Sequence, residues 1–266
     1  MIKVSITILF AVLSLVFPVS GILPAWGKVP VHVPILLYHR FEHAAGDSMT
    51  VTTALFEFQL KYLRNNGYKV IPIRELTDYY LGKGRAPHPR SVVITVDDGH
   101  ISVYRNMVPL VRKYHIPASL FIYPSAISNA SYAMTWGQLR EMKETGFFDF
   151  QSHTFWHPNF KKDRQRLKSA EYEGLVSMQL IKSKERLERE LNVRVDMLAW
   201  PFGIYDGDLI RKAGEAGYVA TFTMERHSAS TLDNVSALPR YLMTNGDRDR
   251  ALVTILADSR EGRKTS

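Results

Sequence analysis

The chain has 266 residues, with 34 Lys and Arg against 26 Asp and Glu, a formal net charge of +8 and 45% hydrophobic residues. This composition excludes a disordered chain, a collagen-like fibre and a membrane protein with several spans. The chain contains no Cys, which excludes a disulfide scaffold, a thiol nucleophile and a Cys-ligated zinc site. A metal ion would have to be held by His, Asp or Glu.

Residues 1–27 have the pattern of a secretory signal peptide. Lys3 precedes an apolar run from Val4 to Phe17, which ends at Pro18 and is followed by small residues. The run is shorter than the roughly 20 residues that span a bilayer. An uncleaved membrane anchor is the alternative. We therefore expect a protein that is secreted or held at the cell surface, with residues 28–266 as one domain.

Strand-like and helix-like patterns alternate along this domain. Strands are predicted at 33–38, 68–73, 91–96, 118–123, 147–151, 197–202, 218–223 and 237–243. Helices are predicted at 53–66, 74–81, 101–115, 135–145, 168–191, 208–216 and 248–256. The alternation predicts an α/β fold with a parallel sheet, closed as a barrel or open as a doubly wound sheet. In either fold, chemistry collects at the carboxyl ends of the strands.

Two carboxylates follow the predicted strand 91–96. Asp97 and Asp98 precede Gly99, and adjacent carboxylates repel each other unless a cation lies beside them. Neighbouring side chains of a strand point to opposite faces. The two carboxylates can therefore have different roles: one can bind a metal ion while the other stays free to act as a base. A solvated Asp-Gly turn is the alternative interpretation.

Two histidines follow the predicted strand 147–151. His153 and His157 are four residues apart, so a helical turn or a tight loop can aim both imidazoles at one ion. The zinc-protease signature H-E-x-x-H has a Glu where Thr154 stands here, so the general base of that enzyme class is missing. With one Asp, the two His make a set of three protein ligands that leaves a position open for water.

Two further segments end predicted strands. Trp200, Pro201, Phe202 and Gly203 follow one of them and can shape a groove for a sugar. His39 follows the strand 33–38. His100 lies next to the Asp-Asp-Gly turn in sequence and is left open as a further candidate.

Three motifs resemble those of NodB-type polysaccharide deacetylases, carbohydrate esterase family 4. They are TVDDG (95–99), SHTFWH (152–157) and WPFG (200–203), and the resemblance extends over about residues 33–245. The sequence is most similar to the exported deacetylases of biofilm poly-β-1,6-N-acetylglucosamine, in which a Y-H motif at the amino end carries the His that acts as general acid. LLYHR (36–40) fits that motif. The resemblance implies a single distorted (β/α) barrel.

The resemblance also implies roles for individual residues. Asp98, His153 and His157 would bind one divalent metal ion, usually Zn²⁺, with Co²⁺ or Ni²⁺ as alternatives. Asp97 would be the general base and His39 the general acid.

Three positions in these motifs depart from the family pattern. Phe202 stands where Tyr is usual, although the family's oxyanion contact at that position is a backbone N–H, which Phe retains. Trp200 stands where many members carry an Arg that orients the base, and Arg240 could replace that Arg. Val96 replaces a usual Phe.

The aromatic residues Tyr38, Trp156, Trp200 and Phe202 could stack on sugar rings.

The implied activity is hydrolysis of N-acetyl groups from N-acetylglucosamine residues of an extracellular polysaccharide, with release of acetate. The alternatives are a peptidoglycan or chitin-oligomer deacetylase with the same site and a catalytically silent glycan-binding module. We expect a monomer that binds this polysaccharide, with the anionic cell envelope as a further partner because of the positive charge. No nucleic-acid partner is expected.

Overall fold

The computed structural model describes residues 31–261. The expected signal peptide, residues 1–27, lies outside the described residues. Within 31–261, none of the helices combines the length and the apolar character needed to cross a bilayer.

The core of the fold is one curled parallel sheet. Its strands are ordered β10-β9-β8-β7-β6-β2-β12, with β5 beside the start of β6. These strands are β2 (Ile35–Tyr38), β5 (Lys69–Val70), β6 (Ser91–Asp98), β7 (Ala118–Ile122), β8 (Phe148–Ser152), β9 (Met197–Ala199), β10 (Ala220–Phe222) and β12 (Tyr241–Leu242). Two small sheets pair β1 (His32–Val33) with β11 (Ala229–Ser230) and β3 (Arg40–Glu42) with β4 (Thr50–Thr52).

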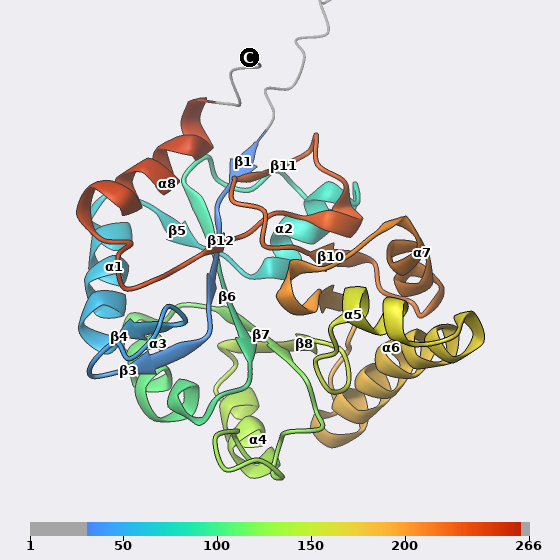
Figure 1. The fold of residues 1–266 in the computed structure, drawn as a ribbon. Coiled ribbons are helices and arrows are strands. Elements are labelled where there is room, and N and C mark those ends of the chain that lie inside the picture. Colours follow the sequence, from blue (N-terminus) through green and yellow to red (C-terminus); the bar gives the residue numbers. More distant parts are fainter. Residues whose placement is uncertain (1–30, 262–266) are drawn as a thin grey trace, which may run out of the picture.

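Helices cover the outside of the sheet, with α8, α1 and α3 on one side of the view, α4 at the bottom, and α6 and α7 on the other side (Figure 1). They are α1 (Thr53–Asn65), α2 (Ile73–Tyr80), α3 (Val108–Tyr114), α4 (Trp136–Glu144), α5 (Phe160–Arg166), α6 (Ser169–Leu191), α7 (Gly207–Glu215) and α8 (Asp249–Glu261). Three short helical turns are η1 (Val103–Met107), η2 (Pro201–Gly203) and η3 (Val235–Ala237).

The α/β prediction is confirmed, and most predicted elements occur with shorter bounds. The strand expected at 33–38 is divided at Pro34, which has no amide hydrogen for a sheet. The helix expected at 101–115 begins with a π-helical turn, in which the Val108 N–H donates to the Val103 carbonyl. Pro109 follows at once and cannot donate within a regular helix. Helix α5 and the short strands β3, β4 and β11 were not predicted.

Residues 237–243 connect the two edges of the curled sheet. Leu238 is bridged to Phe222 of β10, while Tyr241 and Leu242 pair with Leu36 and Leu37 of β2. The sheet therefore forms a distorted half-barrel whose open side is crossed by this one segment, which we call the closing segment. Arg240 lies at its middle.

The strands β8 and β9, which both lead into the candidate site, are joined largely by one side chain. Their only paired position is Ser152 with Leu198. The side-chain oxygen of Gln151 accepts hydrogen bonds from the backbone N–H groups of Asp196 (3.1 Å) and Met197 (2.9 Å). Because Gln151 is fully buried, these bonds replace a strand ladder and fix the separation of the two strand ends.

Candidate active site

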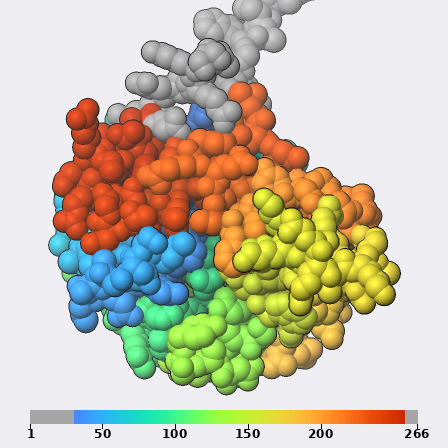
Figure 2. Space-filling model, viewed as in Figure 1, coloured from blue at the N-terminus to red at the C-terminus, as the bar shows by residue number. Residues whose placement is uncertain are grey.

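Polar side chains gather at the carboxyl ends of β2, β6 and β8. The strands are parallel, so their ends meet at one edge of the half-barrel. In the space-filling view, segments from the early chain (blue), the region before α4 (lime) and α5 (yellow) border the same face of the molecule (Figure 2).

Asp98, His153 and His157 converge on one point, and their candidate ligand atoms all lie within 4.8 Å of one another. Oδ1 of Asp98 is 3.6 Å from Nε2 of His153 and 3.7 Å from Nε2 of His157. These distances are too long for hydrogen bonds, but they suit atoms that each lie about 2.0–2.2 Å from a common ion. Oδ1 of Asp98 is buried without a hydrogen-bond partner. The donor set therefore fits a divalent metal ion.

Both imidazoles are prepared to act as neutral ligands. Nδ1 of His153 lies 2.8 Å from the carbonyl oxygen of Ala199, which can only accept, so Nδ1 carries the hydrogen and Nε2 keeps its lone pair. Burial lowers the pKa of His153 to about 3, and burial also lowers the pKa of His157. Both rings are therefore uncharged at neutral pH, as metal binding requires.

Asp97 belongs to a second group of charges in the same site. Its two carboxylate oxygens each accept a 2.8 Å hydrogen bond from Arg240, from Nη1 and Nη2 respectively. Both side chains are buried. Burial alone would raise the pKa of Asp97, but the Arg240 guanidinium, through its charge and its two hydrogen bonds, holds it below its ordinary value. Asp97 is thus an ionised carboxylate at neutral pH.

The guanidinium of Arg240 is itself fixed on three sides. Nε donates to the carbonyl of Thr223 at 3.0 Å, and Nη1 lies 3.4 Å from Oγ1 of Thr95. The charge also lies over the ring of Phe121, 5.3 Å from its centre. The guanidinium therefore holds Asp97 in one orientation, as expected for a residue that replaces the missing family Arg.

The expectation that Asp97 and Asp98 point to opposite faces is wrong. His153 Nε2 lies 3.8 Å from Oδ2 of Asp97 and 3.6 Å from Oδ1 of Asp98, so both carboxylates face the same centre. The cause is the backbone of Asp98, whose φ of 76° leaves the extended region and turns its side chain inward. Gly99 continues the turn at φ 85°, where an added Cβ would lie 3.1 Å from Ile127.

His39 extends β2 beside Asp97. Tyr38 is in register with Val96, so the next residues of the two strands, His39 and Asp97, are neighbours. Burial raises the pKa of Asp98, and a protonated His39 beside it would oppose that rise. Nδ1 of His39 is buried and has no hydrogen-bond partner. His39 therefore lies close to both carboxylates.

His100, the further candidate, has other neighbours. Its Nδ1 lies 2.8 Å from Oγ of Ser102, and its ring stacks on Tyr132. Burial lowers the pKa of His100, and the positive charge of Arg40 adds to that effect.

The four aromatic residues proposed to stack on sugars divide into two pairs. Phe202 and Trp156 are exposed, by 56% and 47%, and the ring of Phe202 lies 4.5 Å from that of His157. Tyr38 and Trp200 are buried. The prediction of a sugar contact is therefore wrong for these two. Trp200 instead donates from Nε1 to Thr221 at 2.8 Å, and Tyr38 donates to Gln59 at 2.8 Å.

Two residues of the site were missed in the sequence. Gln179 of α6 accepts hydrogen bonds from the N–H groups of Phe155 (2.9 Å) and Trp156 (3.0 Å), and so fixes the loop between the two His. No local pattern marks a helix residue for this purpose. Tyr123 lies 5.4 Å, ring to ring, from His157. Tyr123 is the last residue of the predicted strand 118–123. It could therefore have been found from the expectation that functional residues collect at the carboxyl ends of the strands.

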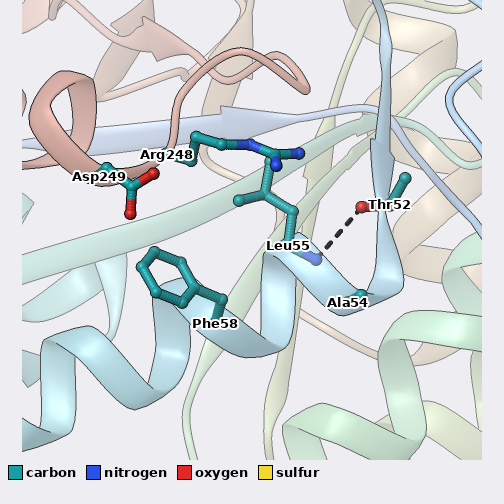
Figure 3. Close-up of a pocket in the computed structure, with 6 residues that line it drawn as sticks. All are labelled: Thr52, Ala54, Leu55, Phe58, Arg248 and Asp249. Carbon is teal, nitrogen blue, oxygen red and sulfur yellow. Dashed lines mark hydrogen bonds between the residues drawn. The ribbon is translucent and has the colours of Figure 1, made fainter.

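A pocket of about 300 Å³ lies between the start of α1 and the start of α8 (Figure 3). Its lining residues are Thr52, Ala54, Leu55, Phe58, Arg248 and Asp249. None of them belongs to the candidate site.

Comparison with known proteins agrees with this geometry. Residues 84–221, just over half of the chain, match the family described as "Polysaccharide deacetylase". The poly-beta-1,6-N-acetyl-D-glucosamine N-deacetylase of Staphylococcus aureus is 28% identical over 200 residues, which cover 74% of this chain and 68% of the relative.

Two solved structures share the fold. The deacetylase PplD of Streptococcus pyogenes, in complex with acetate, superposes with a TM-score of 0.76 at 24% identity, covering 86% of this chain and 99% of that one. IcaB of Ammonifex degensii has a TM-score of 0.72 at 23% identity, covering 86% and 97%. The chain belongs to the polysaccharide deacetylase family. It is therefore a hydrolase of the polysaccharide N-deacetylase type.

Replacing Arg240 tests whether it keeps Asp97 ionised. In Arg240→Met the buried carboxylate loses its partner, so the pKa of Asp97 rises and the acidic limb of the pH profile for deacetylation moves to higher pH. The unpaired charge also lowers the free energy of unfolding, by about 3–5 kcal/mol. The measurement is kcat/KM against pH.

Arg74→Met is the matched control, because Arg74 pairs with the buried Asp196 at 3.0 Å outside the candidate site. It should leave the acidic limb in place. If Arg240→Met does not fold, Arg240→Lys keeps a charge without the bidentate contact and should give a smaller shift in the same direction. An unchanged acidic limb in a folded Arg240 variant would refute the assignment.

Proposed function

We propose that this protein is a metal-dependent deacetylase of β-1,6-linked poly-N-acetylglucosamine. The single observation that carries the chemistry is that two adjacent carboxylates have different partners in one site. Asp98 faces two neutral imidazoles, whereas Asp97 is held by Arg240. One carboxylate is thus available as a ligand and the other as a base. The choice of polymer is supported by the relative from Staphylococcus aureus.

In this proposal Asp98, His153 and His157 hold one divalent ion, and Zn²⁺ suits their nitrogen and oxygen donors. Co²⁺ and Ni²⁺ are the alternatives. When bound, such an ion polarises the acetyl carbonyl and lowers the pKa of water.

The reaction needs a base, an acid and a donor for the oxyanion. Asp97 is ionised and takes a proton from the attacking water. His39, in its protonated form, donates a proton to the leaving nitrogen, since an amine leaves poorly as an anion. The backbone N–H of Phe202 stabilises the negative charge on the acetyl oxygen. Phe202 follows β9 with a left-handed backbone, at φ 57°. The products are acetate and a glycan amine.

We further propose that the protein acts outside the cell, exported by residues 1–27. The apolar run of that segment and the net charge of +8 support export and contact with an anionic envelope.

The test is release of acetate from β-1,6-linked and β-1,4-linked N-acetylglucosamine oligomers by the metal-loaded protein. We expect release from the β-1,6 series, its loss in the presence of a chelator, and its return when Zn²⁺ is added. Preference for the β-1,4 series would instead favour a chitin or peptidoglycan substrate. Full activity of metal-free protein would contradict the mechanism.

His39→Ala tests the assignment of the acid. Without a proton donor, amide hydrolysis should slow by roughly 10²–10⁴-fold. An activated acetyl ester has a leaving group that needs little protonation, so its hydrolysis should be slowed much less. The measurement is the ratio of the amide rate to the ester rate in wild type and variant.

Equal losses on amide and ester would show that His39 only positions or packs the site. The acid would then have to be found elsewhere. His100 would be the next candidate for the acid. His115→Ala is the comparison variant, because His115 caps the end of α3 away from the candidate site, and it should change the ratio of the two rates little.

A further inference from the structure

A row of aromatic side chains, connected by ring contacts and one pair of hydroxyl groups, leads away from the candidate metal site. It begins at Phe202, whose ring lies 4.5 Å from that of His157, and His157 in turn lies 5.4 Å from Tyr123. The hydroxyl groups of Tyr123 and Tyr132 are 2.8 Å apart. The ring of Tyr132 then stacks on His100, at 6.3 Å and 13°. We call these five residues the aromatic row.

Tyr132 is an exposed member of the row, and its backbone is held by hydrogen bonds. Tyr132 is 46% exposed, yet its carbonyl accepts a hydrogen bond from the Ile101 N–H at 2.8 Å. Next to it, the Met134 N–H donates to the Gly99 carbonyl at 3.0 Å, and Ala133 is bridged to His100. The segment that carries Tyr132 is thus bonded directly to the turn that follows Asp97 and Asp98. Its ring is presented at a fixed position relative to the metal ligands.

The ring of Tyr132 is supported from behind. His100 stacks almost parallel to it, and Nδ1 of His100 is fixed by Ser102, which lies 2.8 Å away and also accepts the Phe41 N–H at 3.0 Å. An exposed ring that is already held by a hydroxyl contact and a stacked neighbour has less conformational freedom to lose, so less of its binding energy is spent on ordering.

We propose that Tyr132, backed by His100, binds the sugar unit next to the one being deacetylated. A β-linked pyranose has C–H groups on its flat faces and hydroxyl groups at its rim. An amphipathic ring such as Tyr matches that pattern, with an apolar face and a polar tip. The row is continuous with the metal site, which makes the adjacent unit of the same polymer its occupant. This proposal rests on the proposed deacetylase function.

The test compares substrates of different length in wild type and Tyr132→Ala. In wild type, kcat/KM should rise from the N-acetylglucosamine monomer to the β-1,6-linked tetramer. In Tyr132→Ala this rise should shrink by roughly 3- to 10-fold, the size of one aromatic contact, and the change should appear in KM rather than kcat. Tyr132→Phe keeps the ring and should retain most of the rise.

Phe58→Ala is the matched control, since Phe58 is an exposed aromatic residue (39%) in the separate pocket of Figure 3. It should leave the dependence on length unchanged. The proposal is overturned if Tyr132→Ala keeps the full rise, if it loses kcat on monomer and tetramer alike, or if Tyr132→Phe loses as much as Tyr132→Ala.

A failure of the proposed function gives a different result. In that case wild type would release no acetate from any oligomer. Calorimetric binding of the β-1,6 tetramer to wild type and Tyr132→Ala then tests the sugar site alone, with weaker binding by the variant supporting it and equal binding refuting it.

Discussion

The buried ion pair between Asp97 and Arg240 is the interaction on which the site depends. Two adjacent carboxylates at a strand end cannot both stay ionised without a cation. Arg240 neutralises Asp97 through two 2.8 Å hydrogen bonds, which leaves Asp98 free to face the two imidazoles. Breaking such a pair in a buried position is costly, because the remaining charge cannot be solvated. The same contact therefore distinguishes the two carboxylates and stabilises Asp97, the proposed base, in its ionised form.

This pair also connects the site to the construction of the barrel. Arg240 is 143 residues from Asp97 in sequence and lies on the closing segment, between the contact with β10 and the pairing with β2. The side chain enters the half-barrel from its open side. The segment that closes the sheet therefore also orients Asp97. A change that loosens residues 237–243 should disturb the proposed base without altering the candidate metal ligands.

The sequence predicted which residues gather at the site, but not the direction or exposure of every side chain. Parallel strands bring their carboxyl ends together, so Asp97, His153 and His39 could be expected to be neighbours from strand patterns alone. Strand alternation failed at Asp98, because a left-handed residue turns its side chain inward. The exposure of an aromatic residue could not be predicted either. Trp200 follows β9 directly but is covered by the core, whereas Phe202, two residues later, reaches the surface. Both residues are large and aromatic, so their side chains alone do not show which one is exposed. Tertiary packing decides it.

The most direct test of the division between the two carboxylates is the metal content of two isosteric variants. Asp97→Asn and Asp98→Asn are each loaded with Zn²⁺, passed through a desalting column and measured by elemental analysis, with acetate release recorded in parallel. The account predicts that Asp97→Asn keeps its metal ion and loses turnover, whereas Asp98→Asn loses both. Loss of metal from the Asp97 variant with retention by the Asp98 variant would contradict it.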